Sequence, residues 1–435
     1  MRRIMLWVVL LGAFACTSLH GQEIAEAWQG TLGAGPGIRV VLKISKGSDG
    51  SLGANLYILD QDPHRIPVTS ITVRGGILTL TVDSIHGRYE GKLSADGASI
   101  IGTLTQGETT PLDFQRTTRE TAWPTDPTPH RVQFVAVDKD VKLEVLDWGG
   151  SGRPLILLAG LGNTAHVFDK FAQKLTPSYH VYGITRRGFG ESSVPVPGNG
   201  NYSADRLGDD VLAVIDALKI DRPILVGHSI AGEELSSIGS RHPEKVAGLI
   251  YLEAGYGYAF YDRTHGDLGI DTRELIRRLE VLDSAHGPRE MRAIAQQLID
   301  SDLPRIESDL KEALKFTQGL TGPLPALPAA QLPAAAPDAR QAILEGEQKY
   351  TDIHSPVLAI FGLPHDMGTA FQNDPSARAV LEAYNKASTA AQADAIEAGI
   401  PGAQVVRIPN ADHNIFVSNE ADVLRTMNAF IARLP

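Results

Sequence analysis

The segment Pro223-Ile224-Leu225-Val226-Gly227-His228-Ser229-Ile230-Ala231-Gly232 decides the fold. Its first four apolar residues predict a buried strand, and the residues after Ser229 begin a helical pattern. A serine between a strand and a helix, with small neighbours, is typical of the sharp turn that lifts a nucleophilic hydroxyl above a sheet. The pattern Gly-x-Ser-x-Gly has Ala231 at its fifth position, and Gly232 follows at once. We interpret Ser229 as a nucleophile on a variant of this turn, not as a buried helix cap.

A serine nucleophile needs a base to accept its proton and an acid to orient that base. His413 is the predicted base, because it follows the last predicted strand, Gln404–Ile408, and precedes the C-terminal helix. The chain order serine, acid, histidine requires a carboxylate between Ser229 and His413 at the carboxyl end of a strand. Asp366 is the predicted acid, and Glu253 is the alternative.

The oxyanion that forms during acyl transfer needs two fixed backbone donors. One is normally the N–H after the nucleophile and the other comes from the loop after an earlier strand. These positions correspond to Ile230 and to Leu161 in Ala159-Gly160-Leu161-Gly162-Asn163. We therefore expect the N–H groups of Leu161 and Ile230 to form the oxyanion site.

From residue 131 onward, apolar strands alternate with helical stretches, which predicts an α/β domain with a doubly wound, mostly parallel sheet. Two strands, Arg131–Val137 and Val141–Trp148, are expected to pair first as a hairpin. The strand rhythm stops over residues 256–350, where helical patterns and a stretch rich in proline and alanine take over. An insertion between two sheet strands most often covers the carboxyl edge of the sheet, so it is a candidate helical lid. The predicted strands are Pro154–Ala159, His180–Thr185, Pro223–Val226, Val246–Leu252, Pro356–Phe361 and Gln404–Ile408, and the predicted helices are Ala165–Leu175, Ser203–Leu218, Ile230–Arg241, Thr272–Asp283, Glu290–Ile299, Ile306–Thr317, Pro375–Glu397 and Asn419–Leu434.

Residues 131–435 resemble the α/β-hydrolase superfamily, in its serine esterase and lipase-like branch. Besides the serine turn, Arg187-Gly188-Phe189-Gly190-Glu191-Ser192 is similar to the Arg-Gly-x-Gly-x-Ser loop of that family, whereas Ala159 stands where many members carry histidine. The resemblance implies an enzyme that cleaves carboxylic esters of small molecules through an acyl-enzyme, without a cofactor. Amide or peptide hydrolysis on the same fold is the alternative. Epoxide hydrolases and haloalkane dehalogenases have aspartate at the turn, so Ser229 disfavours them.

Two alternatives from other classes stay open. The first is a non-catalytic ligand-binding protein that keeps the fold. The second is an NADP-dependent oxidoreductase, because Gly160-Leu161-Gly162-Asn163-Thr164-Ala165 fits a dinucleotide fingerprint and Arg186-Arg187 follow the next strand. This second alternative is disfavoured because two strands precede the motif and because Ser229 and His413 then have no role. We expect no metal site, since the chain has no His-Glu-x-x-His and no tight histidine and acid cluster besides His365-Asp366.

Residues 22–119 read as short strands bounded by turn residues, which predicts a small all-β accessory domain, a barrel or a sandwich. Its Trp28-Gln29-Gly30 is weakly similar to the opening of lipocalin-type barrels. Residues 120–130 contain three prolines and predict a linker to the domain at 131–435. The 435 residues thus divide into two predicted domains.

The N-terminus and the charge indicate where the protein acts. Two arginines followed by a short apolar run predict an export signal over residues 1–21, and thus a periplasmic or extracellular protein. The single cysteine, Cys16, lies near the expected cleavage site, where a lipid anchor is the alternative to simple cleavage. No other contact with a membrane is expected. The net charge of −11 argues against a nucleic-acid partner, because phosphate backbones bind cationic surfaces.

Overall fold

The computed structural model describes residues 24–32, 38–47, 50–59, 62–106, 108–118, 121–123, 130–285, 287–319, 339–368 and 374–435. The chain divides into two compact units, Met1–Asp126 and Pro127–Pro435, and each is described by itself. The predicted export signal and Cys16 lie outside the described residues, as does most of the predicted linker. In the described part of the chain, no helix is both long and apolar enough to cross a membrane.

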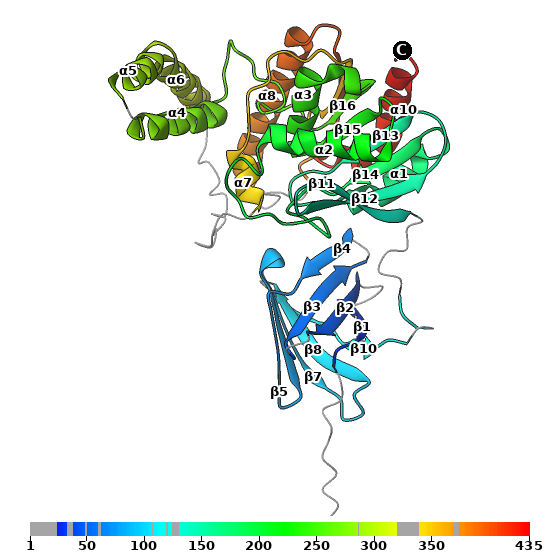
Figure 1. Ribbon diagram of the computed structural model, residues 1–435. Helices are drawn as coiled ribbons and strands as arrows, with labels where there is room; N and C mark the ends of the chain where they lie inside the picture. The colour runs from blue at the N-terminus through cyan, green and yellow to red at the C-terminus, as the bar shows by residue number, and fades with distance from the viewer. Residues whose placement is uncertain are drawn as a thin grey trace, which may run out of the picture. The chain divides into compact units, whose positions relative to one another are not determined.

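The first unit is one antiparallel sheet that curls around its own apolar core (Figure 1). Trp28, Leu78 and Phe114 are fully buried in that core. The sheet order is β4-β3-β2-β1-β10-β8-β7-β6-β5, with β9 paired to β8, so β4 and β5 form its two edges in the described residues. The prediction of an all-β domain is confirmed, but a single half-barrel sheet replaces the expected closed barrel or sandwich. The strands are β1 (Ala27–Leu32), β2 (Ile38–Lys46), β3 (Leu52–Ile58), β4 (Asp62–Pro67), β5 (Ser70–Arg74), β6 (Ile77–Val82), β7 (Gly87–Leu93), β8 (Ser99–Gln106), β9 (Glu108–Pro111) and β10 (Phe114–Arg116).

The second unit has an eight-stranded sheet in the order β11-β12-β14-β13-β15-β16-β17-β18. The first two strands form the expected antiparallel hairpin, β12 pairs antiparallel with β14, and all later pairs are parallel. The predicted α/β class is therefore confirmed. The strands are β11 (Arg131–Asp138), β12 (Val141–Gly149), β13 (Pro154–Leu158), β14 (His180–Ile184), β15 (Ile224–His228), β16 (Gly248–Leu252), β17 (Val357–Gly362) and β18 (Gln404–Ile408).

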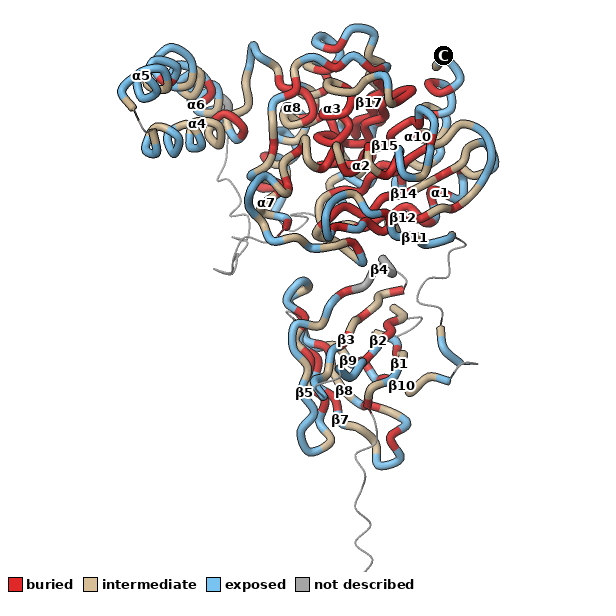
Figure 2. The backbone as a smooth tube through the Cα atoms, viewed as in Figure 1, coloured by how far each residue is buried: buried red, intermediate tan, exposed pale blue. Residues whose placement is uncertain are grey.

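Helices cover both faces of this sheet, and its strands are buried between them (Figures 1 and 2). Successive side chains of a strand point to opposite faces. In β15, Leu225 joins the core beneath α2, α3 and α8, whereas Ile224 and Val226 join the core beneath α1 and α10. This burial on both sides explains why the parallel strands read as continuous apolar runs. The helices are α1 (Asp169–Leu175), α2 (Ala204–Leu218), α3 (Gly232–Arg241), α8 (Pro375–Gly399), α9 (Ile415–Ser418) and α10 (Glu420–Ile431).

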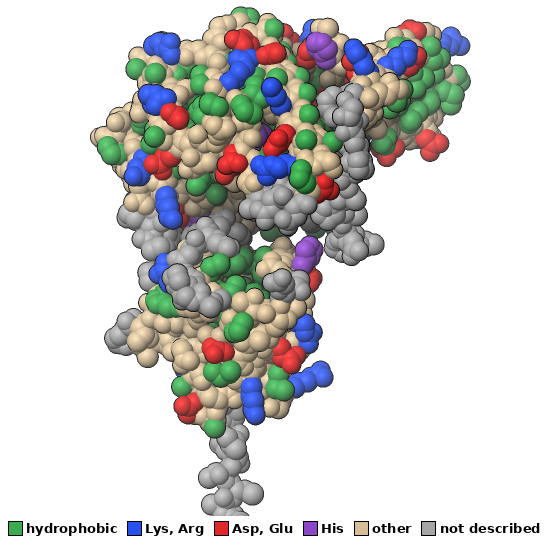
Figure 3. Space-filling view, turned by 180° about the vertical axis from the view of Figure 1, so that it is seen from behind, with side chains coloured by type: hydrophobic (Ala, Val, Ile, Leu, Met, Phe, Trp, Pro, Cys, Tyr) green, Lys and Arg blue, Asp and Glu red, His purple; other side chains and the backbone are tan. Residues whose placement is uncertain are grey.

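An inserted group of helices separates β16 from β17. It consists of α4 (Leu268–Asp283), α5 (Pro288–Gln297), a π-helical turn (Leu298–Asp302), α6 (Leu303–Gly319) and α7 (Ala339–Glu345). The three helices predicted in the insertion match α4, α5 and α6, but α7 was missed. Figure 3 shows hydrophobic side chains gathered on the surface of this group, and Ile299, Leu310 and Leu314 are among the exposed ones. A role of this insertion as a lid stays a prediction.

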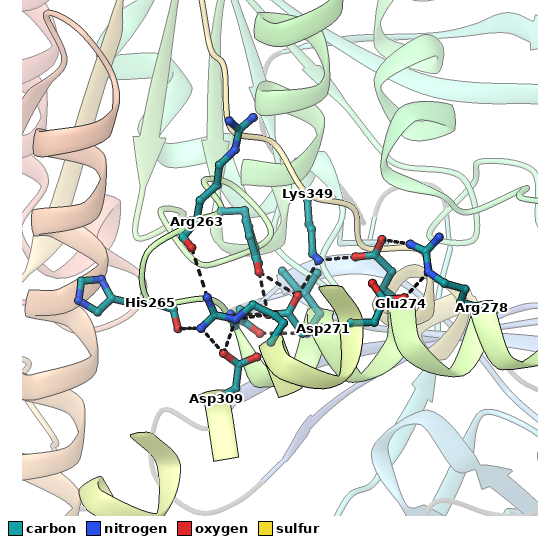
Figure 4. A network of polar contacts seen from close by, with 12 residues as sticks. Arg263, His265, Asp271, Glu274, Arg278, Asp309 and Lys349 are labelled. Carbon is teal, nitrogen blue, oxygen red and sulfur yellow. Dashed lines mark hydrogen bonds and ion pairs between the residues drawn. The ribbon is translucent and has the colours of Figure 1, made fainter. Parts of the chain in front are cut away.

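Ion pairs attach α4 to the chain that returns toward β17 (Figure 4). The Lys349 ammonium lies 2.6 Å from the Asp271 carboxylate and also pairs with Glu274. The Tyr261 hydroxyl, on the segment before α4, donates to the same Asp271 carboxylate at 2.8 Å. Asp271 is buried in the first turn of α4. Its contacts with Lys349 and Tyr261 hold this turn against the segments before and after the inserted helices.

Candidate active site

Ser229 lies on a sharp turn directly after β15. Its φ angle is 53°, a left-handed backbone conformation that non-glycine residues adopt rarely. A Cβ atom on Gly227 would collide with Leu235, and one on Gly232 would collide with the Ala254 carbonyl. Ala231 is fully buried in the core instead. At this turn the backbone that packs closely against Ala254 is therefore that of Gly232, one residue after the fifth position of the motif. The fifth position itself can accept the alanine side chain.

His413 lies in the loop after β18, and its Nε2 is 3.0 Å from Ser229 Oγ. A second histidine holds that loop, because His228 Nε2 lies 2.8 Å from the His413 carbonyl oxygen. A carbonyl only accepts hydrogen bonds, so His228 carries its proton on Nε2. Burial, followed by repulsion from His413, lowers the pKa of His228 to about 4, which keeps it neutral. The serine motif contained His228, but sequence reasoning gave it no role.

Glu253 is the carboxylate that faces His413. It lies directly after β16, is almost fully buried, and its Oε2 is 3.7 Å from His413 Nδ1. That is an ion-pair distance and longer than a hydrogen bond. The same oxygen is 2.7 Å from His365 Nε2, and the Gly362 N–H donates to the other oxygen. Burial raises the pKa of Glu253, but the hydrogen bond from His365 and the nearby His413 imidazole outweigh it and leave that pKa lowered.

Asp366, the acid predicted first, makes neither a hydrogen bond nor an ion pair with His413 among the described residues. Its carboxylate accepts from the Gly368 N–H at 2.8 Å and is exposed, while its own N–H donates to the Ala411 carbonyl at 2.9 Å. His365 pairs with Ala411 in an extended bridge, and adjacent side chains of extended backbone point to opposite sides. Because His365 faces Glu253, Asp366 is directed away. The structure therefore favours the alternative acid, Glu253.

The two predicted oxyanion donors lie in loops that pack against each other at Ser229. A Cβ atom on Gly160 would lie 3.3 Å from Ser229 Cβ and 2.8 Å from His228 Nδ1, so only glycine allows this approach. Leu161 packs with Ile230 in one apolar cluster. The other members of that cluster are Tyr202, Leu207, Ala339 and Ile343, with Phe189, Tyr258, Ala342 and Leu344 packed against it.

Two arginines follow β14, and each forms ion pairs with a buried carboxylate near the site. Arg186 forms two hydrogen bonds to Glu234 of α3, at 2.5 and 3.1 Å, and also donates to the Ala159 carbonyl at 2.9 Å. Arg187 is fully buried and pairs with Asp210 of α2 through bonds of 2.6 and 2.5 Å. Both guanidinium groups are thus committed to internal carboxylates. This argues against the oxidoreductase reading, which needed them for a cofactor phosphate.

Comparisons with known proteins give the family of this fold. A model of the family described as alpha/beta hydrolase fold matches residues 153–420. A fluoroacetate dehalogenase from a Burkholderia species is 33% identical over 116 residues, 26% of this chain and 38% of that protein, so the chain spans well under half of this relative's length. A 2-(acetamidomethylene)succinate hydrolase from Mesorhizobium japonicum is 22% identical over 283 residues, 65% of this chain and 89% of that protein.

Among solved structures, an esterase from a Rhodococcus species is 18% identical with a TM-score of 0.45, and the match covers 70% of this chain and 99% of that one. The family model carries the assignment, since it spans more than half of the 435 residues. This chain belongs to the α/β-hydrolase fold family.

Proposed function

We propose that this protein is a serine hydrolase that cleaves carboxylic esters of small molecules through an acyl-enzyme. The observation that carries the proposal is the 3.0 Å contact between Ser229 Oγ and His413 Nε2, with the Glu253 carboxylate on the far side of the imidazole. This is the arrangement of nucleophile, base and orienting acid that activates a serine. Glu253 takes the acid role in the proposal in place of Asp366.

In the first half of the reaction, His413 Nε2 accepts the Ser229 proton while Oγ forms a bond to the acyl carbon. The N–H groups of Leu161 and Ile230 stabilise the oxyanion. Glu253 stabilises the imidazolium by its negative charge without taking the proton. When the bond between the acyl carbon and the leaving oxygen breaks, His413 returns its proton to the alcohol.

In the second half, His413 removes a proton from water, and the resulting hydroxide oxygen attacks the acyl carbon. The bond to Ser229 Oγ then breaks, and His413 protonates the serine. His228 holds the His413 loop throughout, because its Nε2–H donates to the His413 carbonyl.

The surroundings of Ser229 support an ester with an apolar acyl or alcohol group. Leu161, Tyr258 and Phe189 pack against the apolar cluster that contains Ile230, the residue after the nucleophile. Ala339 and Ile343 of α7 belong to the same cluster. Ester cleavage also asks less of leaving-group protonation than amide cleavage does. We further propose that the enzyme acts after export, as its N-terminal sequence predicts.

The test is a panel of 4-nitrophenyl esters of graded acyl length beside amino-acid arylamides, assayed on the enzyme and on Ser229→Ala. We expect hydrolysis of esters, with a preference for a defined acyl length, and loss of that hydrolysis in the variant. Faster turnover of the arylamides would replace the ester assignment by amide hydrolysis. A folded enzyme that cleaves neither set would contradict the proposal.

A further inference from the structure

A cluster of metal-ligating side chains lies outside the site described above, where the second unit begins. His130 directly precedes β11, His166 lies in the 3₁₀ turn Ala165–Phe168, and Asp169 begins α1. One ligand atom from each residue lies within 4.8 Å of the other two. The side chains are only 2%, 11% and 7% exposed, in that order.

The spacing of these atoms fits a small divalent ion. His130 Nδ1 lies 3.3 Å from Asp169 Oδ1, and His166 Nδ1 lies 3.4 Å from Asp169 Oδ2. Two ligands of a tetrahedral zinc ion, each about 2.0–2.1 Å from the metal, are about 3.3–3.4 Å apart. Two imidazoles and one carboxylate are also a donor set that zinc accepts in proteins.

Neighbouring polar residues hold the side chains of the cluster in place, as hydrogen-bond partners of metal ligands do in known sites. Glu144 Oε1 lies 3.5 Å from His166 Nε2, the ring nitrogen opposite the proposed ligand atom. Thr185 donates to the other oxygen of Glu144 at 2.7 Å, and Trp148 Nε1 donates to Asp169 Oδ1 at 2.9 Å. A carboxylate behind a ligating histidine fixes the ring and raises its basicity.

We propose that His130, His166 and Asp169 form a zinc site that ties the first residues of the second unit to the 3₁₀ turn and to α1. Its role is structural, because its ligands are distinct from Ser229, Glu253 and His413. The sequence analysis expected no metal site, because the chain has no His-Glu-x-x-His and no tight histidine and acid cluster besides His365-Asp366. His130 and His166 lie thirty-six positions apart, so the cluster forms only in the folded chain.

The test is titration of the full-length, chelator-treated protein with Zn²⁺ by calorimetry, together with metal analysis after dialysis. We expect one zinc per chain and a higher melting temperature. Removal of a ligand in His166→Gln or His130→Gln should weaken binding by at least about 10- to 100-fold, the loss seen even for outer partners. Circular dichroism checks that each variant is folded, and His130→Gln serves if His166→Gln is not.

His180→Gln is the matched control. His180 Nε2 also contacts a carboxylate, Asp147 at 2.9 Å, but it is not part of the three-residue cluster, so its loss should leave zinc binding unchanged. Zinc that binds equally well to His130→Gln and His166→Gln overturns the proposal, as does the absence of binding. Zinc binding that disappears only in His413→Ala would assign the ion to the active site and would also overturn it.

Discussion

Replacing Glu253 by glutamine removes the negative charge beside His413 and keeps the shape of the side chain. Two unit charges 3.7 Å apart attract each other by about 4 kcal/mol at an effective dielectric constant of about 20. The His413 side chain is 45% exposed, and screening by water reduces this attraction to about 3 kcal/mol. Since about 1.4 kcal/mol corresponds to a factor of ten, we expect kcat to fall about 100-fold in Glu253→Gln.

Asp366→Asn is the matched control, because Asp366 is exposed and its carboxylate accepts a hydrogen bond from the Gly368 N–H. Its kcat should stay within about threefold of the original enzyme, in line with other surface substitutions. The assay is steady-state hydrolysis of the preferred ester, with circular dichroism to verify folding. The reasoning is refuted if Glu253→Gln keeps its activity while Asp366→Asn loses it, since Asp366 would then orient the base.

The remaining predictions concern the neighbours of the site. His365→Gln removes the hydrogen bond that lowers the pKa of Glu253 most, so that pKa should rise. The acid limb of the pH profile of kcat/KM should then move to higher pH by up to about one unit. An acid limb that does not move contradicts this prediction. Gly160→Ala should lower kcat about 10²- to 10³-fold with folding intact, because the added methyl group displaces the loop that carries the Leu161 N–H. Unchanged single-turnover rates would argue against the Leu161 N–H as an oxyanion donor. Arg187→Met leaves the buried Asp210 carboxylate without its partner. The free energy of unfolding, measured by urea titration, should fall by about 3–5 kcal/mol. A loss below about 1 kcal/mol would show that the protein does not need this ion pair.

The sequence predicted the sheet of the second unit well, because its strands are buried on both faces and read as apolar runs between helices. It also predicted the pairing of Ser229 with His413, which the order of strands and motifs implies. The choice of acid was not predictable in the same way. Glu253 and Asp366 follow the adjacent strands β16 and β17, whose carboxyl ends meet at one edge. Only the direction of the side chains separates them, and the extended bridge at His365 sets that direction.

In the first unit, short strands and turns predicted the all-β class but not its form. Whether a meander closes depends on pairing between its edge strands, and the order of short strands does not tell whether β4 and β5 pair. The histidine and aspartate cluster was missed for a related reason. His130 and Asp169 come together only because the chain before β11 and the beginning of α1 meet in the folded unit.

The central claim is that Ser229 is an activated nucleophile, and covalent labelling tests it most directly. A fluorophosphonate probe reacts with an activated serine and forms an adduct that mass spectrometry can assign to a peptide. We predict an adduct on the peptide that contains Ser229, its absence in Ser229→Ala, and much slower labelling in a folded His413→Ala variant, which lacks the base. A folded original enzyme that stays unlabelled, or labelling that persists in Ser229→Ala, would contradict the account.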